Sequence, residues 1–147
     1  MKKCSEVMTK KPVCCLPTDA VSKVAQWMKK EDVGSIPVID SDKSKKLIGI
    51  VTDRDLAIQI VADGRDPKST KVADVMTSKV FTCLADEDIQ KAVAAMAKHQ
   101  LRRIPVVDKD HKVIGIISQA DVATRVNKRK KKLAAMVKKI SQPRSNL

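Results

Sequence analysis

The residues best suited to chemistry lie in two short segments that share glycine, hydroxyl and carboxylate side chains. The first segment is GIVTDRD, residues 49–55, and the second is GIISQAD, residues 115–121. Each follows an apolar run and places a hydroxyl three positions before an aspartate. Such side chains could bind a metal ion, form a catalytic carboxylate pair, cap a helix or bind a polar ligand.

Helix capping is the simplest interpretation of the shared pattern. Thr52 and Asp55 have the spacing of a capping box, with the hydroxyl at the N-cap and the acid three residues later. Ser118 and Asp121 have the same spacing. We therefore predict that a helix begins at each segment, and capping does not exclude a ligand at the same place.

Metal binding and catalysis are less well supported. Asp53 and Asp55 form a D-x-D pair, but Gln119 replaces the first of these acids in the second segment, and hard cations need several fixed oxygen ligands. The four cysteines form no C-x-x-C pair, and the two histidines lie at no metal-ligand spacing from them. No nucleophile and base recur together. We expect no metal site, no catalytic residue, no disulfide framework and no enzymatic activity.

A sugar hydroxyl fits the two aspartates better than a phosphate does. A strand that leads into a helix N-terminus presents free N–H groups to a polar ligand. A phosphate beside Asp55 would be repelled by the carboxylate, whereas the 2′- and 3′-hydroxyls of a ribose would donate hydrogen bonds to it. If a nucleotide binds, Asp55 and Asp121 should therefore hold riboses, and other residues must meet the phosphate charge.

The elements that would position these residues occur twice in the chain. The matching pairs are KCSEVMT with KVADVMT, SIPVID with RIPVVD, and LIGIVTDRDLA with VIGIISQADVA. Each copy predicts a short strand, a helix, a two-strand hairpin and a second helix, which is an α/β (α+β) fold of β-α-β-β-α units. The first predicted helix has apolar residues at Val21, Val24, Ala25 and Met28. We expect Gly49 and Gly115 to allow close packing between the repeats.

The sequence also predicts the domain organisation. It comprises a first unit at 3–63, a linker at 64–70, a second unit at 71–124 and a basic C-terminal helix or tail at 125–147. Apolar residues make up 43% of the chain, with one Phe, one Trp and no Tyr, so the core should be aliphatic. No apolar run approaches the roughly 20 residues of a bilayer span, and no secretory signal is evident. We therefore expect a cytoplasmic protein.

These motifs resemble the CBS-domain family, whose tandem units are known as Bateman modules. The resemblance rests on the VMT openings, the IPV strands and the two G-h-h-[T/S]-x-x-D segments, and it covers residues 3 to about 124. It implies two units packed with pseudo-twofold symmetry and a ligand cleft between them. It also implies a homodimer, and a stand-alone module suggests an unidentified protein partner.

The resemblance assigns candidate ligand-binding residues to two clefts. The main cleft would contain Thr52, Asp55, Ile50, Val80, Phe81, Leu101, Arg102, Arg103 and Pro105. The second, weaker cleft would contain Ser118, Asp121, Ile116, Pro12, Val13, Gly34 and Ser35. The second cleft is expected to bind more weakly because it lacks a pair of cations. The guanidinium groups of Arg102 and Arg103 suit phosphate, whereas Gly34 and Ser35 stand at the same positions of the first repeat. A solvated strand edge is the alternative interpretation of the arginine pair.

Two functions therefore remain open. The first is a non-catalytic regulatory module that requires no cofactor and senses an adenosyl ligand, namely AMP, ADP, ATP, S-adenosylmethionine or NAD. The second is an interaction protein with a vestigial cleft, whose basic tail docks on nucleic acid or an anionic membrane surface. Nine basic residues and no acidic residue lie from Val122 onward, which favours an anionic partner or a solvated helix that packs on its own domain or on a dimer mate. Specific nucleic-acid recognition is disfavoured because no aromatic stacking surface accompanies the charge.

Overall fold

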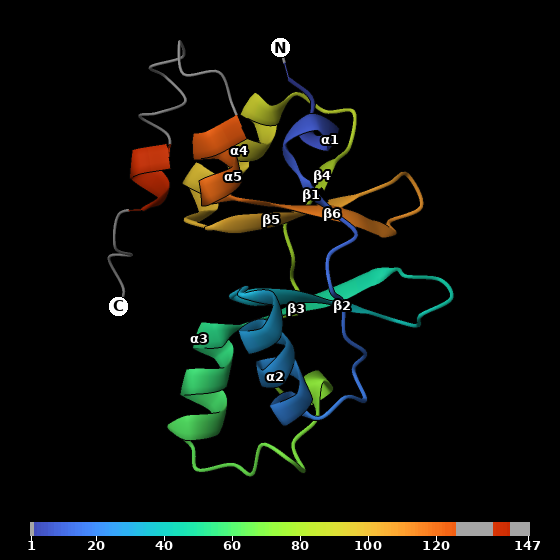
Figure 1. The fold of residues 1–147 in the computed structure, drawn as a ribbon, viewed down its shortest axis with the longest axis vertical. Helices are drawn as coiled ribbons and strands as arrows, with labels where there is room; N and C mark the ends of the chain where they lie inside the picture. Colours follow the sequence, from blue (N-terminus) through green and yellow to red (C-terminus); the bar gives the residue numbers. More distant parts are fainter. Residues whose placement is uncertain (1, 126–136, 142–147) are drawn as a thin grey trace. The chain divides into compact units, whose positions relative to one another are not determined.

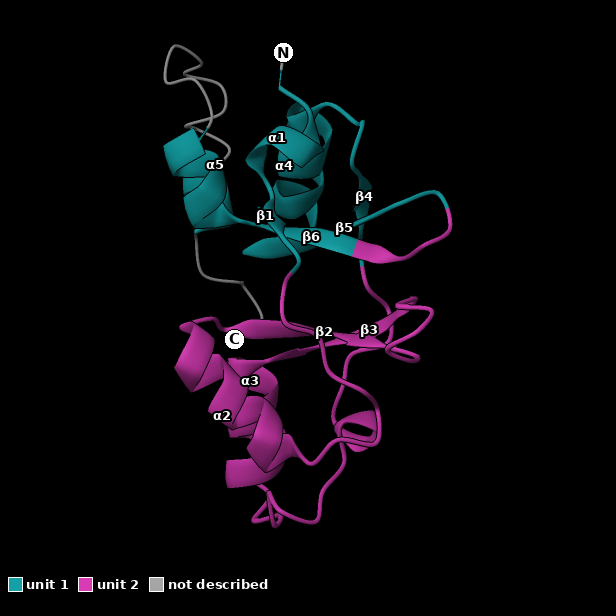
Figure 2. Ribbon diagram, turned by 45° about the vertical axis from the view of Figure 1, so that its right-hand side comes forward, with its two compact units in different colours: residues 1–11, 81–109, 114–147 teal, residues 12–80, 110–113 magenta. Residues whose placement is uncertain are grey.

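The computed structural model describes residues 2–125 and 137–141, and these residues form two compact units. Unit 1 is drawn from Met1–Lys11, Phe81–Lys109 and Ile114–Leu147, and unit 2 from Pro12–Val80 and Asp110–Val113. Figure 1 follows the elements along the chain, and Figure 2 colours the two units.

Unit 2 is built around the hairpin predicted for the first repeat. Its elements are α2 (Val21–Glu31), β2 (Ser35–Ile39), β3 (Leu47–Thr52), α3 (Asp53–Leu56), the π-helix η1 (Ala57–Val61) and the 3-10 helix η2 (Val72–Asp74). Strands β2 and β3 are antiparallel and place Ser35 opposite Thr52. Every residue of β2 is buried, whereas β3 alternates between buried and half-buried positions. The predicted hairpin is confirmed.

Unit 1 is built around the hairpin of the second repeat and also contains the opening segment of the first repeat. Its elements are α1 (Cys4–Val7), β1 (Thr9–Lys10), β4 (Cys83–Leu84), α4 (Ile89–His99), β5 (Arg103–Val107), β6 (Val113–Ser118) and α5 (Gln119–Arg125). The strands form one sheet in the order β1-β6-β5-β4, in which β1 is antiparallel to β6 and β4 is parallel to β5. Helices α1, α4 and α5 cover one face of this sheet (Figure 1). The mixed α/β fold class is confirmed.

The opening segment of each repeat packs with the hairpin of the other repeat. Thr9 pairs with Ile116 in unit 1, and Thr77 forms the equivalent bridge to Ile50 in unit 2. Figure 2 shows α1 and β1 in the same colour as the elements of the second repeat. The compact units therefore differ from the sequence repeats because each hairpin pairs at its edge with a segment from far along the chain.

The helices form where their apolar spacing predicts, with one exception. Val21, Val24 and Met28 of α2 are buried, but Ala25 is exposed although its repeat counterpart Val93 in α4 is buried. The N-terminus of α2 has no side-chain cap. Instead, the N–H of Val21 donates to the carbonyl oxygen of Thr70 at 2.9 Å, so the predicted linker also caps this helix.

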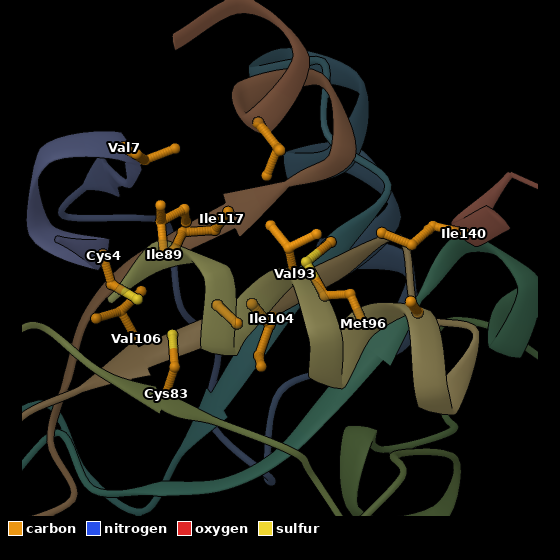
Figure 3. Close-up of a cluster of buried hydrophobic side chains, with 13 residues drawn as sticks. Cys4, Val7, Cys83, Ile89, Val93, Met96, Ile104, Val106, Ile117 and Ile140 are labelled. Carbon is orange, nitrogen blue, oxygen red and sulfur yellow. The ribbon is translucent and has the colours of Figure 1, made fainter. Parts of the chain in front are cut away.

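Each unit has its own cluster of buried apolar side chains, and both clusters are aliphatic apart from cysteine sulfur. The cluster of unit 2 centres on Val24, Ile36, Val38 and Val51. The cluster of unit 1, shown in Figure 3, contains Cys4, Val7, Cys83, Ile89, Val93, Met96, Ile104, Val106, Ile117 and Ile140 among others. The predicted aliphatic core is therefore confirmed for the described residues.

The predicted basic tail lies largely outside the described residues, because 126–136 and 142–147 are not described. Residues 137–140 are helical. Ile140 is buried in the cluster of unit 1, and Val137 packs against that cluster. These two apolar side chains therefore pack on the protein's own unit. Among the described helices, none combines the length and apolar character needed to cross a bilayer.

Candidate functional site

Both repeated segments form capping boxes at the ends of their hairpins. The N–H of Thr52 donates to Oδ2 of Asp55 at 2.9 Å, and the N–H of Asp55 donates to Oγ1 of Thr52 at 3.1 Å. The corresponding bonds of Ser118 and Asp121 are 2.9 and 3.0 Å long. The capping prediction is confirmed in both copies, and one carboxylate oxygen of each aspartate is engaged by its cap.

The second carboxylate oxygen distinguishes the two aspartates. Oδ1 of Asp121 lies 3.6 Å from Nη2 of Arg125, one turn further along α5. Arg125 is held in place because its Nη1 also donates to the carbonyl oxygens of Val7 at 2.9 Å and Met8 at 3.2 Å. Within the described part of the chain, Oδ1 of Asp55 has no such partner. The aspartate of the first segment therefore has an available Oδ1 acceptor, whereas that of the second segment is occupied by an ion pair.

The residue at the position of Arg125 in the first repeat explains this difference. That residue is Gln59, and its Nε2 donates to the carbonyl oxygen of Val75 at 2.9 Å. Val75 is the repeat counterpart of Val7, so Gln59 and Arg125 bind equivalent backbone carbonyls. A neutral amide makes that contact in unit 2, and therefore this position brings no cation to Asp55.

The residues that precede β2 and β5 lie beside the capping boxes of their own units. The N–H of Asp53 donates to the carbonyl oxygen of Gly34 at 2.9 Å, and the N–H of Gln119 donates to that of Arg102 at 2.8 Å. Buried Ser35 is paired with Thr52 in the hairpin. Unit 2 therefore brings together Gly34, Ser35 and the Thr52 cap, whereas unit 1 brings together Arg102 and the Ser118 cap.

The predicted ligand-lining residues are distributed over both units. Ile50 and Thr52 share the half-buried face of β3, and Ile116 and Ser118 share that of β6. Half-buried side chains also include Pro12, Val13, Val80, Phe81, Leu101 and Arg103, while Pro105 is buried and Arg102 is exposed. The main cleft draws on both units, so its assembly from Asp55 and the two arginines stays a prediction.

Phe81 has a partner that sequence reasoning missed. Its ring stacks on that of His99, with the ring centroids 3.7 Å apart and an angle of 14° between the planes. His99 lies at the end of α4 and is half-buried. No sequence periodicity links the two rings. The ion pair between Asp121 and Arg125, by contrast, was detectable from its i, i+4 spacing on a helix.

The glycines of the two segments serve close packing. A Cβ atom at Gly49 would lie 2.8 Å from Sδ of Met76 and 3.0 Å from the carbonyl oxygen of Thr77. A Cβ atom at Gly115 would overlap the side chain of Met8. Both methionines belong to the VMT opening of the other repeat, so the predicted packing role of the glycines is confirmed.

Cys14 and Cys15 are poor nucleophiles in the folded protein. Burial raises the pKa of Cys14 to about 11 and that of Cys15 to about 12. A thiol with so high a pKa has almost no thiolate at neutral pH. The described residues contain no group of three or more His, Cys, Asp or Glu side chains suited to a metal ion. The expectation of no metal site stays a prediction.

Comparison with known proteins identifies the family of these repeats. The model of the family described as "CBS domain" matches residues 4–62 and 72–128. An uncharacterised protein of Bacillus subtilis, YlbB, is 41% identical over 123 residues, covering 84% of this chain and 81% of its own length. Hypoxic response protein 1 of Mycobacterium tuberculosis is 30% identical over 118 residues, covering 80% of each chain.

Solved structures show the same fold. A crystal structure of hypoxic response protein I, which holds two coordinated zinc ions, has a TM-score of 0.77 at 28% identity and covers 86% of this chain and 100% of its own. A CBS domain pair in complex with 5′-methylthioadenosine and S-adenosyl-L-methionine also has a TM-score of 0.77, at 23% identity, covering 88% of this chain and 99% of its own.

Proposed function

The chain belongs to the CBS-domain family, and we propose that it is a non-catalytic regulatory module that binds an adenosyl ligand through Thr52 and Asp55. The ligand class comprises AMP, ADP, ATP, S-adenosylmethionine and NAD. The observation that carries the proposal is the divided carboxylate of Asp55, whose Oδ2 caps the helix while Oδ1 has no partner among the described residues.

The fixed carboxylate suits a ribose. The cap holds Asp55 in one orientation because its Oδ2 accepts from the N–H of Thr52. An acceptor that is already oriented loses little conformational entropy on binding. The 2′- and 3′-hydroxyls of a ribose are the donors that such an acceptor binds in dinucleotide folds. The apolar side chain of Ile50, on the same face of β3 as Thr52, would contact the rest of the nucleoside.

The phosphate charge requires separate residues. A phosphate next to Asp55 would be repelled, so we assign it to Arg102 and Arg103, whose guanidinium groups suit phosphate oxygens. Arg102 is exposed and so can reach a ligand. The other proposed contacts of this main site are Val80, Phe81, Leu101 and Pro105. An S-adenosylmethionine ligand has no phosphate and would depend less on the arginines.

The second site is proposed to be weaker. It would consist of Ser118, Asp121, Ile116, Pro12, Val13, Gly34 and Ser35. Because Arg125 already pairs with Asp121, a ribose there would have to compete with the guanidinium group for the carboxylate. Gly34 and Ser35 also offer no positive charge to a phosphate.

The solved CBS domain pair with 5′-methylthioadenosine and S-adenosyl-L-methionine supports the choice of ligand class, since a protein of this fold holds two adenosyl compounds. Ligand binding would regulate the partner by favouring one conformation of the module over another, to the extent that the ligand binds the two conformations with different affinity. We propose that the module acts as a cytoplasmic homodimer on a separate protein partner.

The test is a thermal-shift series with AMP, ADP, ATP, S-adenosylmethionine, 5′-methylthioadenosine and NAD. A ligand at about 100 times its Kd should stabilise the fold by about 2.7 kcal/mol. Asp55→Asn keeps the size of the side chain and should abolish the response. Asp121→Asn is the matched control and should leave most of it. An equal loss in the two variants would contradict the proposed main site.

A further inference from the structure

Cys4 and Cys83 face one another in the core of unit 1. Cys4 lies in α1 and Cys83 in β4, and their exposed fractions are 0% and 4%. Each thiol shifts the pKa of the other, that of Cys4 downward and that of Cys83 upward. The Cys83 thiol also lies 3.9 Å from the carbonyl oxygen of Pro105. Figure 3 shows the sulfur ends of both side chains pointing toward one another, next to Val106.

Backbone contacts fix the position of Cys4 against the segment that follows β4. The N–H of Cys4 donates to the carbonyl oxygen of Glu87 at 2.9 Å, and the N–H of Ser5 donates to that of Ala85 at 2.9 Å. The backbones of Lys3 and Asp88 form an isolated antiparallel β-bridge. The approach of the two sulfur atoms is therefore set by the fold on both sides.

The other repeat shows that packing alone does not require this pair. Val72 stands at the position of Cys4, and Cys15 stands at the position of Cys83. Val72 and Cys15 are buried together in the cluster of unit 2. A valine and a cysteine thus fill the equivalent space, and the second thiol of unit 1 adds chemistry that unit 2 lacks.

We propose that Cys4 and Cys83 form a reversible disulfide that ties α1 to β4. The oxidant is a small disulfide. The Cys4 thiolate attacks one sulfur of the oxidant, whose S–S bond breaks to release one thiolate. The Cys83 sulfur then attacks the Cys4 sulfur and releases the second thiol. The two protein thiols are oxidised, the oxidant is reduced to two thiols, and the two protons pass to the released thiols.

The two thiols have different roles in this step. The contact with Cys83 lowers the pKa of Cys4, although burial and the charges of Glu87 and Asp88 oppose that effect. The same contact, together with burial, raises the pKa of Cys83. Cys4 is therefore the attacking group. Because both thiols are buried, the reaction requires α1, a helix of four residues near the N-terminus, to open locally.

The disulfide is tested by oxidation with the disulfide of 2-mercaptoethanol, followed by alkylation of free thiols and peptide mapping under non-reducing conditions. One sample is oxidised in the folded state, and another is unfolded and refolded with the oxidant, so that access is not limiting. We expect a Cys4–Cys83 cross-link and free Cys14 and Cys15. The midpoint of thermal unfolding should rise by about 10 °C and return to its original value after reduction.

Two variants make the result specific. Cys4→Val copies Val72 of the other repeat, so it should fold, and it should lose both the cross-link and the oxidation-dependent shift. Cys14→Ser should retain both. Four free thiols in the refolded sample, or a cross-link through Cys14 or Cys15 in place of the expected one, would overturn the proposal. The result does not depend on whether an adenosyl ligand binds.

Discussion

Arg125 and Asp121 form an ion pair across one turn of α5, with Nη2 and Oδ1 3.6 Å apart. The equivalent positions of the first repeat hold Gln59 and Asp55, and no cation reaches that carboxylate among the described residues. The two capping boxes are thus alike in their hydrogen bonds and different in their charge. This difference separates a main from a weaker ligand site in the proposed function.

Exchanging Gln59 and Arg125 between the repeats should exchange the relative affinities of the two ligand sites. Arg125→Gln copies Gln59, so it should keep a hydrogen bond to the carbonyl oxygen of Val7 while releasing Asp121. We expect the second site to bind more tightly, by roughly two- to fivefold, since an ion pair of this exposure is worth about 0.3–1 kcal/mol. Isothermal titration with the ligand found in the thermal-shift series would measure both the affinity and the number of sites.

Gln59→Arg is the reciprocal variant. It should place a cation next to Asp55 and weaken the main site to a similar degree. If Gln59→Arg left the main affinity unchanged while it folded normally, the availability of the Asp55 carboxylate would not determine ligand binding.

The capping boxes should contribute similar amounts to stability. Thr52→Ala and Ser118→Ala each remove a hydroxyl that accepts from a backbone N–H. Each should lower the free energy of unfolding by about 1 kcal/mol, measured by urea denaturation. Thr52→Ser keeps the acceptor and should have a much smaller effect. A loss as large in Thr52→Ser as in Thr52→Ala would assign the effect to the methyl group instead.

The two glycines should respond differently to alanine. Gly49→Ala places a Cβ against the backbone oxygen of Thr77, whereas in Gly115→Ala all three of the closest atoms belong to the Met8 side chain. Both should lower the free energy of unfolding by roughly 1–3 kcal/mol because the sites are already filled. In double-mutant cycles, Met8→Ala should recover much of the loss at Gly115.

The double-mutant cycle that combines Met76→Ala with Gly49→Ala provides the control. Met76→Ala should recover less of the loss at Gly49, since the contact with the Thr77 oxygen persists. Equal recovery at the two glycines would show that the Thr77 backbone can move away.

Alkaline pH should destabilise unit 2. Burial raises the pKa of Cys14 to about 11 and that of Cys15 to about 12, while a thiol in an unfolded chain ionises near 8.5. Above pH 9 the unfolded state therefore releases thiol protons that the folded state retains, and stability falls as the pH rises toward the folded pKa values. This contribution is fully present below about pH 8.

Urea midpoints between pH 7.5 and 10 would measure the effect. Cys15→Ala should reduce the loss of stability over this range, even though the variant is less stable at every pH. An unchanged pH dependence in Cys15→Ala would contradict a raised pKa for that thiol.

Local patterns in the sequence predicted most of each repeat. The β-branched runs at Ser35–Ile39 and Leu47–Thr52 predicted the hairpin, and the spacing of hydroxyl and acid predicted both capping boxes. These features depend on residues close in sequence, so alternation and spacing reveal them. Ala25 was misplaced because a helical period marks the apolar face but not its edges.

Contacts between distant segments could not be predicted in the same way. The pairing of Thr9 with Ile116 and the stack of Phe81 on His99 join residues that share no local pattern. The proximity of Cys4 and Cys83 was missed for the same reason, since 79 positions separate them in the sequence. Single hydrogen bonds, such as that of Gln59, likewise required coordinates.

The most direct test of the proposed function is the affinity of one adenosyl ligand for the unmodified protein and for Asp55→Asn, measured by isothermal titration. We predict binding to the unmodified protein, loss of that binding in Asp55→Asn, and near-normal binding in Asp121→Asn. Unchanged binding in Asp55→Asn, or no binding of any of the six compounds to the unmodified protein, would contradict it.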